Sequence, residues 1–239
     1  MRIFVFPFLF FALYTPSVFA QESNVIETIT HNAKQLAENN DYEKAVILLD
    51  SALIRHQNSL SLHYTLGEIY LKIKDYTKAD KAFAKVLKLD KHHFRGNYYR
   101  GITSAHKGDY YNSVKYFSKA VHINPYYAKA YYNLAISKGH IDRYGDAIKD
   151  LNKAIDLDPE YYKAYHNRGY WKDMIGLHKE AIEDQQHALD INPFYVDAYN
   201  TMAEAKYEIG DQKGACEDWK KALNLGSYIA EELFNKFCE

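Results

Sequence analysis

The residues that could carry chemistry in this chain are two cysteines, eleven histidines and an unusually large set of 23 tyrosines. Among the histidines, His106 and His140 lie 34 residues apart and are the pair that could hold a metal ion. Zinc sites need at least three protein ligands, however, and no third one accompanies this pair. No HExxH helix, nucleophile elbow or phosphate-binding glycine loop occurs in the chain. We therefore expect no metal, no cofactor and no enzymatic activity.

The composition and net charge of the chain indicate which classes of partner it can bind. The chain has 239 residues, of which 47% are apolar and 26% charged, as in an ordinary soluble folded protein. Its formal net charge of −1 provides no field to attract nucleic acid or an anionic membrane. We therefore expect no nucleic-acid partner.

The first twenty residues are typical of a secretory signal peptide. Arg2 precedes an apolar run over residues 3–14, and Val18 and Ala20 place small residues before a cleavage point. We predict a signal peptide over residues 1–20, cleaved after Ala20, and a short N-terminal segment over 21–25. An uncleaved membrane anchor is the alternative, but twelve apolar residues fall short of the roughly 20 that span a bilayer. The protein should then be secreted or periplasmic, with no transmembrane segment in the mature chain.

The rest of the chain repeats with a period of 34 residues, marked by Pro125, Pro159 and Pro193. Counting in this period defines six units without insertions: 26–59, 60–93, 94–127, 128–161, 162–195 and 196–229. The eighth position is small in every unit: Ala33, Gly67, Gly101, Ala135, Gly169 and Ala203. We predict two antiparallel helices in each unit, helix A over positions 2 to 14 and helix B from about 18 to 30. The small residues let these two helices approach closely.

This pattern resembles the tetratricopeptide repeat family. Its motif has an aromatic residue at position 4 (Tyr131, Tyr165, Tyr199), alanine at position 20 (Ala147, Ala181, Ala215) and proline at position 32. The match extends over residues 26 to about 229. The resemblance implies an all-α fold, a right-handed superhelical solenoid of antiparallel helix pairs, in which the A helices line a concave groove. It also implies a protein–protein interaction module.

In that fold, positions 2, 5, 6, 9, 12 and 13 of helix A point into the groove. They place tyrosine, asparagine and basic residues there, and we predict a peptide-binding groove formed by Tyr98, Tyr99, Lys129, Tyr132, Asn133, Lys163, His166, Asn167, Tyr170 and Asn200. Tyrosine supplies contact area with a polar tip, and asparagine can bond a peptide backbone. The alternative is that these tyrosines mostly pack on one another. The family's chaperone-tail clamp has five positions, of which only Asn133 and Lys163 match here. Sugar binding is a minor alternative.

The repeat register also predicts ion pairs within the last three units. Lysine stands at position 11 and aspartate at position 23 of the last three units, so we expect a lysine–aspartate contact within each of them, or else two solvated faces. The pairs are Lys138 with Asp150, Lys172 with Asp184, and Lys206 with Asp218.

A capping helix over residues 228–239 should cover the last unit. Cys216, near the start of the last B helix, and Cys238, near the end of the cap, then become neighbours. We predict a disulfide between them, because cysteines brought together in an oxidising compartment favour a bridge. Two unpaired cysteines are the alternative.

We expect a non-catalytic scaffold that binds an extended segment of a protein or peptide, whose identity the sequence does not supply. The alternative is an assembly subunit of a cell-envelope complex that uses the convex face and the chain ends.

Overall fold

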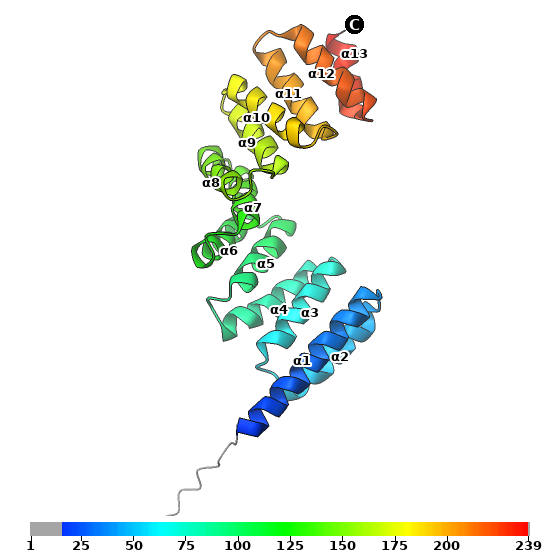
Figure 1. Ribbon diagram of the computed structural model, residues 1–239, viewed down its shortest axis with the longest axis vertical. Helices are drawn as coiled ribbons and strands as arrows, with labels where there is room; N and C mark the ends of the chain where they lie inside the picture. Colours follow the sequence, from blue (N-terminus) through cyan, green and yellow to red (C-terminus); the bar gives the residue numbers. More distant parts are fainter. Residues whose placement is uncertain (1–15, 239) are drawn as a thin grey trace, which may run out of the picture. The chain divides into compact units, whose positions relative to one another are not determined.

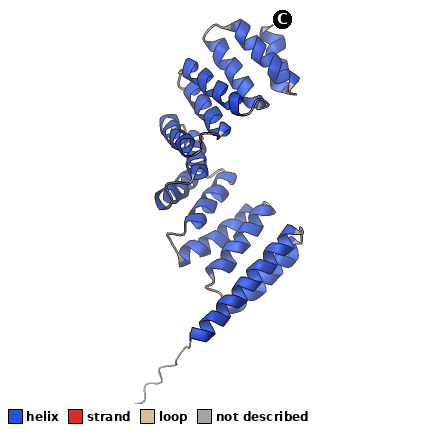
Figure 2. Ribbon diagram, in the orientation of Figure 1, coloured by secondary structure: helices blue, strands red, loops and turns tan. Residues whose placement is uncertain are grey.

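The computed structural model describes residues 16–238, in which every regular element is an α-helix (Figure 1, Figure 2). The apolar run of the predicted signal peptide lies outside the described residues. Helix α1 (Pro16–Glu38) begins at a proline, which the first turn of a helix tolerates. It therefore includes residues 21–25, which the sequence suggested as a separate segment. No helix within residues 16–238 combines the length and apolarity needed to cross a membrane.

The chain forms two compact parts, an N-terminal part (1–89) and a C-terminal part (90–239). In the N-terminal part, α1 pairs with α2 (Tyr42–Arg55) and α3 (Leu60–Lys72) pairs with α4 (Tyr76–Leu89). Helix α3 also contacts both helices of the first pair. These two pairs correspond to the first two predicted units.

The C-terminal part contains four further helix pairs and a final single helix. In chain order the elements are α5 (Phe94–His106), α6 (Tyr110–Ile123), α7 (Ala128–Gly139), α8 (Tyr144–Leu157), α9 (Tyr162–Met174), α10 (His178–Ile191), α11 (Val196–Glu208), α12 (Gln212–Asn224) and α13 (Tyr228–Phe237). Each A helix packs on its own B helix, and each B helix on the next A helix. This is a solenoid of antiparallel helix pairs, as the sequence predicted (Figure 1).

The turn between helices A and B has the same backbone in every unit. The residue at position 15 has a positive φ, between 60° and 84°: Asn40, Lys74, Gly108, Asp142, Gly176 and Gly210. A left-handed residue ends an α-helix and satisfies its last carbonyl groups. Asparagine and glycine adopt this conformation readily, which is why the Asn-Asp and Gly-Asp pairs in the sequence mark these turns.

Small residues at position 8 let the two helices of a unit approach. A Cβ added to Gly67 would lie 2.7 Å from the Phe83 ring, and one added to Gly101 would lie 2.6 Å from the Phe117 ring. Both rings are 0–1% exposed, so they fill the space that the missing side chains leave. The A–B interface of these units therefore depends on glycine opposite a buried aromatic ring.

The predicted lysine–aspartate contacts are confirmed in all three units. The Nζ–Oδ2 distances are 2.6 Å for Lys138–Asp150, 2.8 Å for Lys172–Asp184 and 2.5 Å for Lys206–Asp218. Asp184 and Asp218 are nearly fully buried and receive a second cation each, Arg168 and Lys221. Burial raises the pKa of Asp150 in spite of its lysine partner.

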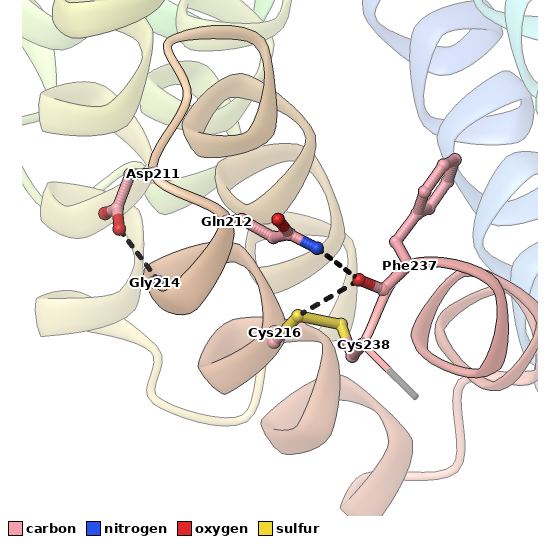
Figure 3. The surroundings of a disulfide bond; sticks show 6 residues. All are labelled: Asp211, Gln212, Gly214, Cys216, Phe237 and Cys238. Carbon is pink, nitrogen blue, oxygen red and sulfur yellow. Dashed lines mark hydrogen bonds between the residues drawn. A yellow bond between two sulfur atoms is a disulfide. The ribbon is translucent and has the colours of Figure 1, made fainter.

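Helix α13 packs on α12 at the C-terminal end of the array. Figure 3 shows the surroundings of the two cysteines that connect these helices. The Phe237 ring stacks on Trp219, with ring centroids 5.9 Å apart. In the structure the Sγ atoms of Cys216 and Cys238 lie at the 2.00 Å bonding distance of a disulfide. The Gln212 amide also donates a hydrogen bond to the carbonyl oxygen of Phe237, at 2.6 Å. The end of the cap is thus tied to the first turn of α12.

Candidate functional site

The A helices of the C-terminal part lie side by side, since α5 contacts α7, α7 contacts α9 and α9 contacts α11. We call the surface made by these four helices the A-helix surface. All ten residues of the predicted groove belong to these helices. The structure brings seven of them together, whereas His166, Asn200 and Tyr170 make other contacts.

Tyr98 and Tyr99 line a pocket at the start of the A-helix surface. The pocket has a volume of about 340 Å³, and its lining consists of Phe94, Arg95, Tyr98, Tyr99, Asn124 and Tyr127. The Tyr98 ring makes edge contacts with Tyr99 and Tyr127, both at 5.3 Å between centroids. Burial raises the pKa of the Tyr98 hydroxyl, which therefore stays protonated and acts as a hydrogen-bonding group.

Asn133 and Asn167 make the same two hydrogen bonds, one repeat apart. The Asn133 amide donates to the Lys129 carbonyl oxygen at 2.8 Å and to the Tyr98 hydroxyl of the preceding unit at 3.1 Å. The Asn167 amide donates to the Lys163 carbonyl oxygen at 2.8 Å and to the Tyr132 hydroxyl at 3.2 Å. Both amide groups are therefore oriented by bonds within the protein. In the described residues, neither side-chain Oδ1 atom accepts a hydrogen bond.

The last residue of three units is a tyrosine, which sequence reasoning did not place in the site. Tyr127, Tyr161 and Tyr195 contact the residue at position 5 of their own unit, with ring centroids 5.3, 4.9 and 5.0 Å from those of Tyr98, Tyr132 and His166. Burial raises the pKa of both Tyr161 and Tyr195. Their spacing of 34 residues is the signal that could have identified them. These ring contacts agree in part with the alternative interpretation of the groove, because several of its tyrosines pack on other tyrosines.

The prediction for His166 needs correction, because its ring is directed into its own unit. His166 Nδ1 lies 2.9 Å from Oε1 of Gln185, whose amide donates to the His166 carbonyl oxygen at 3.0 Å. Gln185 is fully buried at position 24, where other units have an apolar residue. It therefore needs polar partners, and His166 supplies them. Burial lowers the pKa of His166.

Asn200 is likewise not a groove residue. It is 9% exposed, and its amide donates to the Ser227 hydroxyl at 3.0 Å. The same hydroxyl accepts from the backbone N–H of Ala230 and so caps α13. Asn200 thus supports the C-terminal cap. Tyr170, by contrast, keeps 37% of its surface exposed, and its ring contacts Trp171.

Neither histidine of the candidate metal pair belongs to a metal-binding cluster. The exposed His140 ring stacks on Tyr110 with centroids 4.2 Å apart. Across the part of the chain that the structure describes, no three histidine, cysteine or carboxylate side chains are grouped as metal ligands would be.

Comparison with known proteins agrees with this architecture. Family models for the tetratricopeptide repeat match residues 61–93, 128–161 and 162–195. The search of curated proteins found no significant match.

Several solved structures are similar to this one. A crystal structure of MamA is 30% identical, with a TM-score of 0.64, covering 72% of this chain and 98% of that one. YrrB, titled a TPR protein with an unusual peptide-binding site, is 21% identical with a TM-score of 0.66, covering 77% and 96%. PilF of Pseudomonas aeruginosa is 14% identical with a TM-score of 0.75, covering 90% and 98%.

The repeat register, the helix pairs with small residues between them, and the likeness to MamA along nearly all of that protein agree. The chain belongs to the tetratricopeptide repeat family.

Proposed function

We propose that this protein is a non-catalytic interaction module whose A-helix surface binds an extended segment of a partner protein. The observation that carries the proposal is the aromatic pocket of about 340 Å³ at Tyr98 and Tyr99, which lies on the surface that also presents Asn133 and Asn167. Concave sites that combine aromatic walls with a few oriented polar groups are typical ligand sites.

The asparagines supply the polar part of the site. Their amide nitrogens are held by carbonyl and tyrosine oxygens, so each side chain has one orientation before a ligand arrives. Each Oδ1 atom remains an acceptor for a peptide N–H. Side chains fixed in advance lose little conformational entropy on binding, which favours affinity.

The pocket supplies the apolar part of the site. Four aromatic rings line it, and a protonated tyrosine hydroxyl lies among them. A large apolar or aromatic side chain of the bound segment would bury its surface there. The likeness to YrrB supports this proposal only at the level of the fold.

A random-peptide display selection against the mature protein tests the proposal. Selected peptides should bind wild-type protein, and Tyr99→Arg should weaken them about tenfold or more by placing a charge in the pocket. Asn133→Ala with Asn167→Ala should also weaken them, whereas Asn235→Ala, an exposed asparagine on α13, should not. Circular dichroism would verify that each variant stays helical. Equal affinity of all variants for every selected peptide would refute binding at this surface.

We also propose that the protein is exported and then cleaved after Ala20. The arrangement of residues 1–20 supports this proposal, and so does the pairing of both cysteines. Cleavage would shorten α1, so that the mature helix begins at Gln21. Intact-mass measurement of protein from the extracytoplasmic fraction would test it. If the exported protein still carried residues 1–20, the proposed cleavage after Ala20 would be contradicted.

A further inference from the structure

A second pocket, of about 490 Å³, lies on α6 and the loop that precedes α5. Its lining consists of Lys91, His92, Ser118, Lys119, His122 and Ile123. None of these residues lines the aromatic pocket. Two lysines and two histidines thus surround a concavity whose apolar wall includes Ile123.

The segment of the chain that carries this pocket is basic. Residues 91–123 contain six lysine and arginine side chains and a single carboxylate, Asp109, in a protein whose net charge is −1. The following repeat, residues 128–161, has five basic and six acidic side chains. The net charge therefore changes from positive to negative between the segment of the pocket and the next repeat.

Comparison of equivalent repeat positions shows where the lining of this pocket differs from the later units. Lys91 stands at position 32, where the next three units have proline. His122 stands at position 29, where the next two units carry Asp156 and Asp190. Lys119, at position 26, has Lys153 as its counterpart in the next unit. Equivalent positions of a solenoid have equivalent geometry, so this pocket differs in charge from the corresponding place in the next unit. The preceding unit carries Lys85 and Lys88 at positions 26 and 29, where they line a pocket with Gln57 in place of Lys91.

The loop that forms one wall is held in place. The fully buried Asn97 donates hydrogen bonds to the carbonyl oxygens of Lys91 and His93, at 3.2 and 3.1 Å. The adjacent carboxylate, Asp90, accepts from the backbone N–H of His92 and does not line the pocket. In the described residues, no carboxylate forms an ion pair with Lys91 or Lys119. Their charges are available to a ligand, and the wall that carries Lys91 is already ordered.

We propose that this basic pocket binds an acidic protein segment, with carboxylates at Lys91 and Lys119 and an apolar side chain against Ile123. Charge complementarity and the apolar wall both favour such a segment. A long polyanion or a flat anionic membrane would need an extended basic surface, whereas the next repeat carries more acidic than basic side chains. The pocket has the size for one or two side chains rather than for a whole domain.

Fluorescence anisotropy with a short fluorescein-labelled peptide, in which glutamates surround one leucine, tests the proposal on the mature protein. The peptide should bind, its affinity should fall as salt is added, and a glutamine version should bind at least about tenfold more weakly. Lys91→Glu with Lys119→Glu should weaken binding about tenfold or more. Lys153→Glu, which makes the same charge change as Lys119→Glu alone at the same repeat position one unit later, should leave affinity within about twofold. Peptides selected on the A-helix surface should bind all these variants equally, which separates the two proposals.

Several results would overturn the proposal. An equal loss in Lys153→Glu would mean that only the overall charge matters. Failure of the glutamate peptide to bind would exclude an acidic segment, and binding to anionic phospholipid vesicles in its absence would assign the pocket to a membrane surface. If light scattering shows self-association that Lys119→Glu abolishes, with no peptide binding, the occupant would be a second copy of the chain.

Discussion

Removal of the disulfide should loosen the C-terminal cap selectively. Replacing Cys216 and Cys238 with serine leaves α13 held by packing of Phe237 on Trp219 and Tyr207, by the Ser227 cap and by the Gln212 hydrogen bond. The sulfur–carbonyl contact of 3.9 Å at Phe237 contributes little, because a bridged sulfur carries no proton to donate. The bridge is the covalent restraint on the end of the helix.

The size of the effect follows from the length of the closed loop. The two cysteines are 22 residues apart in sequence. A loop of this length stabilises the folded form by about 3 kcal/mol on the chain-entropy model. Since 1.4 kcal/mol corresponds to a factor of ten, the open population of the cap should rise about a hundredfold. In a solenoid each element contacts only its neighbours, so the effect should stay near α12 and α13.

Hydrogen–deuterium exchange of the mature protein provides the measurement. Amides of residues 230–238 should exchange about a hundredfold faster in the double-serine variant, or in wild type with reductant, whereas those of α9 should not change. Reductant should have no effect on the variant, which controls for other consequences of the reagent. Unchanged protection of α13 after verified reduction would refute the reasoning and show that packing alone holds the cap.

Three other substitutions test the packing, a buried charge and a histidine. Gly139→Ala should destabilise the protein by about 1–3 kcal/mol in urea unfolding, because the added Cβ would lie 2.1 Å from the Trp171 ring. Gly145→Ala is the control: its added Cβ would have no neighbouring atom within 4 Å, so the substitution should be neutral or slightly stabilising. Asp184→Asn should cost about 3–5 kcal/mol, since it leaves two cations facing a buried neutral amide; a cost under about 1 kcal/mol, as for surface pairs, would show that the pair is hydrated. The pKa of His166 is lowered in the folded protein, so the unfolded chain takes up the proton first and stability should fall as pH drops below about 6.5. Wild type should therefore lose more stability than His166→Gln between about pH 7.5 and 5. An equal loss in both proteins would contradict the buried, neutral state of this histidine.

The fold could be predicted because the same weak signals recur at one period. Small residues at position 8 and the turn residues at position 15 each have a single structural explanation, which six units repeat. The ion pairs were predictable for the same reason, since positions 11 and 23 face each other in every antiparallel pair. Helix α1 was less predictable at its start, because proline suits the first turn of a helix as well as a break.

The site was predicted only in part, because side-chain direction depends on partners outside the repeat pattern. Asn200 has the position of a groove residue, but the last unit is followed by a cap whose Ser227 takes its amide. His166 turns inward because Gln185, a polar residue at a core position, needs hydrogen bonds. In both cases one non-repeated residue changes the role of a repeated one.

Tyr127, Tyr161 and Tyr195 also determine how this array can change in length. Each stands at the N-cap of the following A helix, where tyrosine provides no capping hydrogen bond, and its ring packs on the preceding unit instead. Deletion of residues 128–161 would join Tyr127 directly to Tyr162 and bring Asn167 to the Tyr98 hydroxyl that Asn133 now occupies. The tyrosine–asparagine contact would thus be rebuilt, whereas α6 and α9 would meet for the first time, with Ala105 in the place of Gly139 opposite Trp171. A change in the number of repeats here would therefore alter the length of the A-helix surface and keep its tyrosine–asparagine contacts, but it would also require a small residue opposite Trp171.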